Sequence, residues 1–463
     1  MLKIYNTISR KKEKFKSIHD GKVNLYTCGP TVYDYAHIGN FRAYMFEDLL
    51  RRALEYFEYD VLHVMNITDI DDKTIKKSIN ENKSLEDITS FYTDCFFKDV
   101  ETLNILPAHH YPKATSFVDE MIEMIETLID KGNAYSTRDG SVFFKISSFS
   151  NYGKLAKLNP DDMVSGERVD SDEYEKQEVR DFALWKSYKE EDGDIFWNSP
   201  WGKGRPGWHI ECSCMSGHYL GDRFDIHCGG VDNIFPHHEN EIAQSECYYG
   251  KKFVNYWMHN EHLKVEGEKM SKSKGNFYTI RDLIEEKNFS PSAIRYTLLS
   301  THYRQRLNFT FEKINSSQKA INRLRELVRR LNDINNDNGD SFIDDTNKML
   351  DSFSKYLSDD LNISGALGEL FSWANIMFSK IDSNLLSKKG ADLALNSIDK
   401  VDLVIGCINN IELISNDIKN LIKDREQARE DKDWVLSDNI RKELLDKGIH
   451  IEDTPTGTIW KKK

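Results

Sequence analysis

The sequence predicts an α/β protein: a Rossmann-like parallel-sheet domain with an insertion, followed by a helical bundle and a small C-terminal domain. A strand, helix, strand pattern occupies residues 23–70, and parallel sheets are built from units of this order. Residues 113–199 lose this regularity, and from about 312 onward apolar residues recur at helical spacing. A chain of 463 residues also exceeds what one hydrophobic core usually organises, so we expect several domains.

The first strand is predicted at Val23–Thr27, and Gly29-Pro30 ends it. A helix is predicted to open at His37, and Val61–Ile67 is predicted to be the next strand. The helix has one apolar face at helical spacing, made of Phe46, Leu49, Leu50, Ala53, Leu54 and Phe57. These segments predict one β-α-β unit.

The sheet signal returns at Arg223–His227, after the irregular stretch with its acidic middle at 161–178. An insertion between two halves of the sheet explains the interruption. Gly229-Gly230 predicts a turn. Pro236 predicts a helix start, because the missing proline N–H would be unpaired at the first helical position anyway.

Beyond residue 312 the pattern predicts helices. One apolar face consists of Ile321, Leu324, Val328 and Leu331. A second helix is marked by Phe353, Leu357 and Leu361. The Asn/Asp-rich stretch 332–345 between them predicts a loop, and the last segment has a helix of its own around Trp434.

Composition excludes several classes of protein. Hydrophobic residues make up 39% and charged residues 30%, which is typical of globular proteins, and no apolar run is long enough to span a bilayer. The net charge of -13 argues against a protein that coats nucleic acid, although a local basic patch could still bind it. Seven scattered cysteines are a poor disulfide framework, so we expect a reducing, cytoplasmic location.

Two segments are candidates for binding phosphate. At the helix start near His37, unpaired backbone N–H groups favour an anion, and His37 and Asn40 would add donors. The alternative is an ordinary helix cap, since Asn is common there. In Lys269-Met-Ser-Lys-Ser, Lys269 and Lys272 supply positive charge where a triphosphate would need it. The alternative is a solvated basic loop.

A metal site is also indicated. Cys28 ends the first strand, where α/β folds place ligands, and His237 and Glu241 project from one helical face. Together with Cys212 they would offer two thiolates, an imidazole and a carboxylate, a set that suits tetrahedral zinc. Spacing alone leaves other candidates open, namely Cys214, Cys228, His209, His227, His238 and Glu239.

Several motifs carry a resemblance to a known family. His37-Ile-Gly-Asn and Lys269-Met-Ser-Lys-Ser resemble the two signatures of class I aminoacyl-tRNA synthetases, with Asn40 in place of the more usual histidine. Four further segments resemble cysteinyl-tRNA synthetases in particular, namely Thr27–Asp34, Asn66–Lys73, Arg205–Ser213 and Phe235–Glu241. The likeness runs essentially from end to end.

This resemblance implies the site residues. In that family the zinc ligands match Cys28, Cys212, His237 and Glu241, and the catalytic residues match His37, Asn40, Lys269 and Lys272. Cys28, Thr31, Trp208 and Asp232 match the amino-acid pocket, with Asp232 holding either the substrate ammonium or the ATP ribose. Arg429, Trp434, Asp438 and Asp453 match residues that would contact anticodon bases.

The resemblance also implies the reaction and its partners. We expect ATP-dependent ligation of L-cysteine to tRNA(Cys) through a cysteinyl-adenylate, with Mg²⁺ accompanying ATP and one Zn²⁺ per subunit. Shape alone separates near-isosteres such as cysteine and serine by only about 10- to 200-fold, whereas zinc prefers a soft thiolate to a hydroxyl. We hypothesise that the substrate thiolate joins the zinc as a fifth ligand. No membrane contact and a monomeric state are expected.

The same resemblance divides the chain into six parts. They are 1–112, the first half of the Rossmann catalytic domain; 113–199, the connective insertion; 200–250, the second half of the catalytic domain; 251–311, the junction with the Lys-Met-Ser-Lys-Ser loop; 312–424, the helical bundle that contacts the tRNA stem; and 425–463, the anticodon-binding module.

Overall fold

The computed structural model places the chain in two compact units, Met1–Asn409 and Asn410–Lys463. The described residues are 1–158, 163–169, 179–408, 416–447, 449–454 and 457–462. The acidic stretch 161–178 therefore lies largely outside them. In this part of the chain, every helix is too short or too polar to cross a lipid bilayer.

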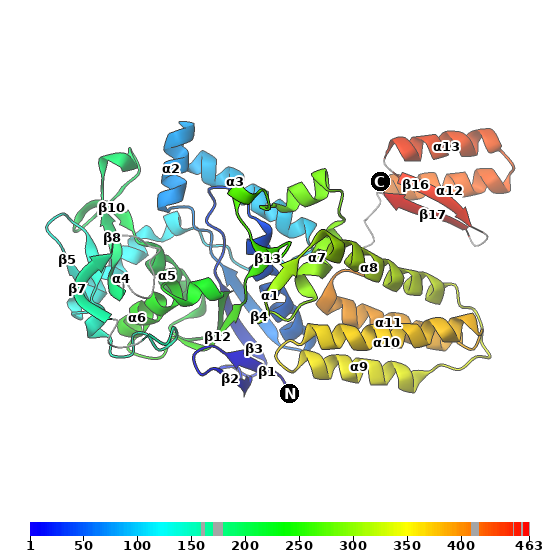
Figure 1. Cartoon of the computed structure of the whole chain (residues 1–463), viewed down its shortest axis with the longest axis horizontal. Helices are drawn as coiled ribbons and strands as arrows, with labels where there is room; N and C mark the ends of the chain where they lie inside the picture. The colour runs from blue at the N-terminus through cyan, green and yellow to red at the C-terminus, as the bar shows by residue number, and fades with distance from the viewer. Residues whose placement is uncertain (159–162, 170–178, 409–415, 448, 455–456, 463) are drawn as a thin grey trace. The chain divides into compact units, whose positions relative to one another are not determined.

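The first unit is organised by a four-stranded parallel sheet in the order β12-β11-β3-β4, of which β3, β4 and β12 are labelled in Figure 1. Its strands are β3 (Lys22–Thr27), β4 (Asp60–Met65), β11 (Phe224–Gly230) and β12 (Val254–Asn260). Strands β3 and β11 are neighbours although about half of the unit separates them in sequence. The predicted α/β fold with a parallel sheet is confirmed.

Helices cover both faces of this sheet. Helix α1 (Ile38–Tyr56) joins β3 to β4 and packs its apolar face on one side, in the cluster that contains Leu25 and Ile226. On the other side Tyr26 and Trp257 pack with residues of α5 (Trp208–Leu220) and α6 (His237–Tyr249). The predicted helix at Pro236 exists, but α6 begins one residue later. Pro236 is its N-cap, because the Pro236 carbonyl accepts the first helical hydrogen bond from Asn240 N–H at 2.9 Å.

The segment between β4 and α5 carries a second, mostly antiparallel six-stranded sheet in the order β5-β6-β8-β10-β9, with β7 on β8. Its elements are α4 (Val118–Asp130), β5 (Ala134–Ser136), β6 (Val142–Phe144), β7 (Met163–Val169), β8 (Val179–Ser187), β9 (Trp197–Ser199) and β10 (Gly202–Pro206). This sheet is the predicted insertion into the parallel sheet.

Smaller elements complete the region around the parallel sheet. They are β1 (Lys3–Asn6), β2 (Lys11–Lys14), α2 (Asp72–Glu81), α3 (Leu85–Thr102), β13 (Leu263–Val265), β14 (Glu268–Lys269), α7 (Pro291–Leu299) and β15 (Leu307–Phe309). Strands β13, β14 and β15 form a small sheet. This sheet carries the loop that contains Lys269-Met-Ser-Lys-Ser, which we call the lysine-rich loop.

Four helices follow, α8 (Phe311–Asn332), α9 (Ile343–Leu357), α10 (Ile363–Asp382) and α11 (Lys388–Ile405). Leu361 was predicted within the second of them, and this is wrong because α9 ends at Leu357. Asp360 and Leu361 have φ angles of 63° and 55°, so the chain turns there in a left-handed conformation. Leu361 is buried by this turn, which explains why its apolar spacing mimics a helix.

The second unit contains α12 (Asn416–Glu430), α13 (Trp434–Asp446) and a hairpin of β16 (Ile449–Thr454) with β17 (Gly457–Lys462). A small cluster that includes Ile440, Leu444 and Ile449 packs the helices against the hairpin. The helix predicted around Trp434 is present. The six domain boundaries derived from the sequence remain predictions.

Candidate active site

A cavity of about 1010 Å³ opens at the carboxyl ends of β3 and β11. Carboxyl ends of parallel strands are where α/β folds bind ligands. The cavity brings together residues that are far apart in sequence, and among its lining residues are Cys28, Thr31, His37, Asn40, Trp208, Asp232, Lys269 and Lys272. All of the residues assigned by resemblance to ATP and the amino acid therefore lie on one cavity.

The start of α1 is a reciprocal cap. His37 N–H donates to Asn40 Oδ1 at 3.0 Å, and Asn40 N–H donates to His37 Nδ1 at 3.2 Å. His37 and Asn40 thus form the hydrogen bonds of an ordinary helix cap, as the alternative interpretation expected. Capping occupies Nδ1 and Oδ1, so His37 Nε2 and Asn40 Nδ2 are the atoms that remain for a ligand. Burial lowers the pKa of His37, which keeps the imidazole neutral.

The lysine-rich loop lies against this helix start. Tyr278 carbonyl accepts from Ile38 N–H at 3.0 Å, and the rings of Phe277 and His37 meet edge to face at 5.0 Å. Lys272 Nζ lies 2.8 Å from Asp34 Oδ2. The segments 34–40 and 269–278, which contain the two signatures, are therefore in direct contact.

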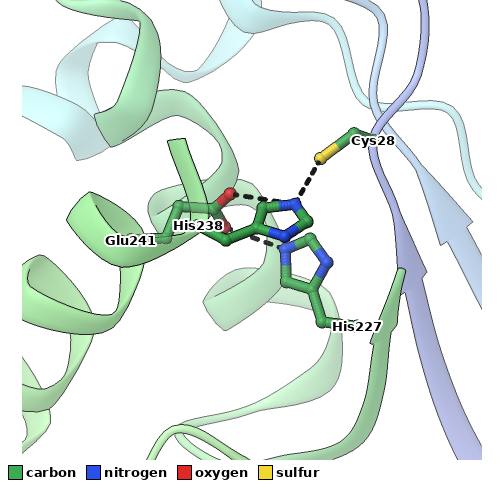
Figure 2. A group of neighbouring side chains, drawn as sticks. All are labelled: Cys28, His227, His238 and Glu241. Atoms are coloured by element: carbon green, nitrogen blue, oxygen red, sulfur yellow. Dashed lines mark hydrogen bonds and ion pairs between the residues drawn. The ribbon is translucent and has the colours of Figure 1, made fainter. Parts of the chain in front are cut away.

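Beside this cavity, metal-ligating side chains converge in two overlapping sets. One is Cys28, Cys212, His237 and Glu241, and the other is Cys28, His227, His238 and Glu241; in each set the ligand atoms lie within 4.8 Å of one another. Cys28 extends from the end of β3, His227 from β11, and His238 and Glu241 from α6 (Figure 2). Gly29 allows this position of Cys28, because a Cβ there would lie 1.7 Å from the Asn66 carbonyl oxygen.

Hydrogen bonding favours the first set. His237 Nε2 and Glu241 Oε1 are buried and face each other at 3.1 Å as an ion pair, but among the described residues neither atom has a partner with hydrogen-bond geometry. Buried polar atoms are rarely left in this state, so they fit ligands that face a metal. In the second set His227 Nε2 lies 2.9 Å from Glu241 Oε2, and His238 bonds Cys28 Sγ at 3.3 Å (Figure 2).

The protonation states also suit a metal. Burial lowers the pKa of His237 to about 3, so its imidazole is neutral and can ligate. The Cys212 thiol donates a hydrogen bond to the Cys28 sulfur, and this bond together with burial raises the pKa of Cys212 well above that of a free thiol. A metal must therefore displace the proton from this thiol. Two thiols, an imidazole and a carboxylate form a donor set that fits zinc.

Two histidines that spacing alone left open as metal ligands contact residues of the first set. His209 Nδ1 lies 2.9 Å from His237 Nδ1, and His227 holds Glu241 Oε2. His259, which the sequence did not single out, bonds His238 at 2.8 Å. Asp34 was also missed, although it ends one of the motifs that carry the resemblance. Only tertiary contacts distinguish these supporting residues from ligands.

The residues predicted to contact the anticodon belong to the second unit. Trp434 begins α13 and is 57% exposed, and the guanidinium of Arg429 lies 5.8 Å from its ring centroid. Asp438 is exposed one turn further along α13. The side chain of Asp453 lies outside the described residues, although its backbone belongs to β16.

The family model that matches residues 14–319 places the chain among the class I aminoacyl-tRNA synthetases. The fold is similar to that of Mycobacterium tuberculosis methionyl-tRNA synthetase in complex with methionyl-adenylate, with a TM-score of 0.60, 16% identity, and coverage of 83% of this chain and 89% of that chain. Residues 14–319 match the family model described as tRNA synthetases class I (C) catalytic domain.

Relatives in sequence narrow the class further. The chain is 52% identical to the cysteine–tRNA ligase of Brachyspira hyodysenteriae, covering 99% of both chains. It is 49% identical to the cysteine–tRNA ligase of Protochlamydia amoebophila, covering 100% of this chain and 98% of that one. The chain belongs to the cysteine–tRNA ligase family.

Proposed function

We propose that this chain joins L-cysteine to tRNA(Cys) in two steps. The cysteine carboxylate attacks the α-phosphate of ATP, and the bond to pyrophosphate breaks to give cysteinyl-adenylate. A hydroxyl of the terminal tRNA ribose then attacks the cysteinyl carbonyl, and AMP leaves. One observation carries the proposal: a group of cysteine, histidine and glutamate side chains that could hold a metal ion, and two segments that resemble nucleotide-binding signatures, adjoin one cavity.

Phosphate chemistry is assigned to the two contacting segments. The first N–H groups of α1, with His37 Nε2 and Asn40 Nδ2, hold the triphosphate, and Lys269 and Lys272 stabilise charge on the leaving pyrophosphate. Catalysis then rests on orientation and electrostatics, with Mg²⁺ accompanying ATP. Asp232, which lines the same cavity, is assigned to the ribose.

The amino-acid end of the cavity is assigned to Cys28, Thr31 and Trp208. The indole of Trp208 stacks on the His237 ring at 4.2 Å, so it can close the pocket beside the metal ligands. Cys28, Cys212, His237 and Glu241 would hold zinc. When bound, zinc acts as a Lewis acid that prefers the sulfur of a cysteine substrate to the hydroxyl of serine.

Pyrophosphate exchange tests the activation step. The purified chain should exchange labelled pyrophosphate into ATP when cysteine is present, and exchange with serine should be slower by on the order of 10⁴-fold. Charging of purified tRNA(Cys) tests the second step and separates this reaction from ligation of cysteine to another acceptor. Equal exchange with serine would contradict the proposed role of the metal.

Anticodon recognition is assigned to the second unit. Replacing Trp434 with Ala should lower kcat/KM for tRNA charging by about 5- to 150-fold, because stacking on one base is worth about 1–3 kcal/mol. Asp438→Ala should act in the same direction. Pyrophosphate exchange needs no tRNA and should stay at the wild-type rate. Leu445→Ala, which alters another exposed apolar residue of α13, is the matched control. Equal damage to exchange and charging would argue against an anticodon role.

A further inference from the structure

The contact between the lysine-rich loop and the start of α1 includes one ion pair that the proposed mechanism does not use. Lys272 Nζ lies 2.8 Å from Asp34 Oδ2, although 238 positions separate the two residues in sequence. Both residues line the cavity. Asp34 precedes the His37 segment, so the pair joins the two nucleotide-binding segments by charge.

Apolar and backbone contacts surround this pair. Met270 packs against Gly39 so closely that a Cβ on Gly39 would lie 3.2 Å from the Met270 methyl carbon. Lys272 Nζ lies 5.1 Å from the ring centroid of Phe277, and that ring contacts His37. The backbone of the loop is held by a hydrogen bond from Ser271 N–H to Asn276 Oδ1 at 2.8 Å. The Lys272 side chain has a flexible four-carbon stem, so a carboxylate partner adds to the ring contact in holding its ammonium.

A second pair in the same loop provides a comparison. Lys274 Nζ lies 2.7 Å from Glu268 Oε2, and these side chains are 54% and 60% exposed. Neither residue is among those that line the cavity. In the first pair Lys272 is 69% exposed and Asp34 is 33% exposed, and the hydrogen bond that Lys272 donates to Asp34 raises the pKa of Lys272. Of these two pairs, only the pair at Asp34 joins residues that line the cavity.

We propose that Asp34 is a positioning residue whose carboxylate holds the Lys272 ammonium at the cavity until the phosphate oxygens of ATP take it over. The inference rests on the proposed function, since it assigns Lys272 to the triphosphate. Asp34 acts only through Lys272 and makes no contact with the reacting atoms. When pyrophosphate leaves, the carboxylate recaptures the ammonium, which readies the site for the next ATP.

Limited digestion with trypsin, without nucleotide, tests the pair independently of catalysis, because trypsin must take the lysine side chain into its own pocket. Cleavage after Lys272 should be about fivefold faster in Asp34→Asn, the factor that corresponds to an exposed ion pair of ~1 kcal/mol. Cleavage after Lys274 should respond to Glu268→Gln instead. Equal rates of cleavage after Lys272 in wild type and Asp34→Asn would overturn the proposal.

Pyrophosphate exchange tests the consequence for activation. Asp34→Asn should slow cysteine-dependent exchange about fivefold, while Asp34→Glu, which keeps the charge, should restore most of the rate. Glu268→Gln should leave the rate unchanged. In a Lys272→Ala background Asp34→Asn should have no further effect. The same fivefold loss in that background would show that Asp34 acts independently of Lys272. A wild-type chain without exchange activity would refute the proposed function, and the digestion result would still decide the role of Asp34.

Discussion

Replacing Cys212 with Ser should remove zinc from the protein and with it the preference for cysteine over serine. The thiol lies in a set with Cys28, His237 and Glu241, and its loss leaves three ligands of which only one is a sulfur. The cysteine-to-serine ratio of kcat/KM in pyrophosphate exchange should fall from on the order of 10⁴ towards the 10- to 200-fold that shape alone provides. Metal analysis of the same samples measures the zinc content.

Cys214→Ser is the matched control for this substitution. Cys214 lies on the same helix and is also buried, at 8% exposure, but it packs in the core of the insertion rather than beside the cavity. This variant should keep both zinc and selectivity. Loss of zinc from Cys214→Ser, or retention of zinc by Cys212→Ser, would contradict the assigned ligand set.

A further pair of substitutions distinguishes the two overlapping sets of possible metal ligands. His237→Gln should lose zinc outright, because His237 Nε2 is the buried atom that faces Glu241 Oε1. His227→Gln should weaken zinc binding by only about 10- to 100-fold, the usual cost of removing a residue that orients a ligand. The reverse order of zinc affinities would favour the set that contains His227 and His238.

The sequence predicted those parts of the fold that depend on local periodicity, and it did not predict those that depend on tertiary packing. The strand at Val23–Thr27 and the helix that follows it depend on local periodicity, and both were predicted within a few residues. The pairing of β3 with β11 depends on tertiary packing that no local pattern records. The prediction that Leu361 lies in a helix was wrong for a related reason, because a residue buried in a turn happened to have helical spacing.

The site was predictable only in part for the same reason. Helical spacing places His237 and Glu241 on one face, because residues four apart lie side by side. Nothing in the spacing connects Cys28 with Cys212, so the resemblance to a family had to select them. The supporting roles of His209 and His227 depend on hydrogen bonds between separate elements. Such bonds become visible only when the chain is folded.

Lys272→Ala should lower the rate of cysteinyl-adenylate formation by on the order of 10²- to 10³-fold, the usual cost of removing one preorganised group that stabilises developing charge. Lys272 lines the cavity and lies next to the helix start that is assigned to the triphosphate. The proposed zinc ligands come from other elements, so zinc content should not change. Pyrophosphate exchange and metal analysis on one preparation measure both quantities.

Lys274→Ala provides the control, because it removes an equal charge from the same loop at a position outside the cavity lining. If negative phosphate were attracted by the net charge of the loop, both alanine variants would lose activity to a similar degree. If one ammonium must sit at the leaving pyrophosphate, only Lys272→Ala should be impaired. A normal exchange rate in Lys272→Ala would refute its assigned role, and equal losses in both variants would reduce that role to general attraction.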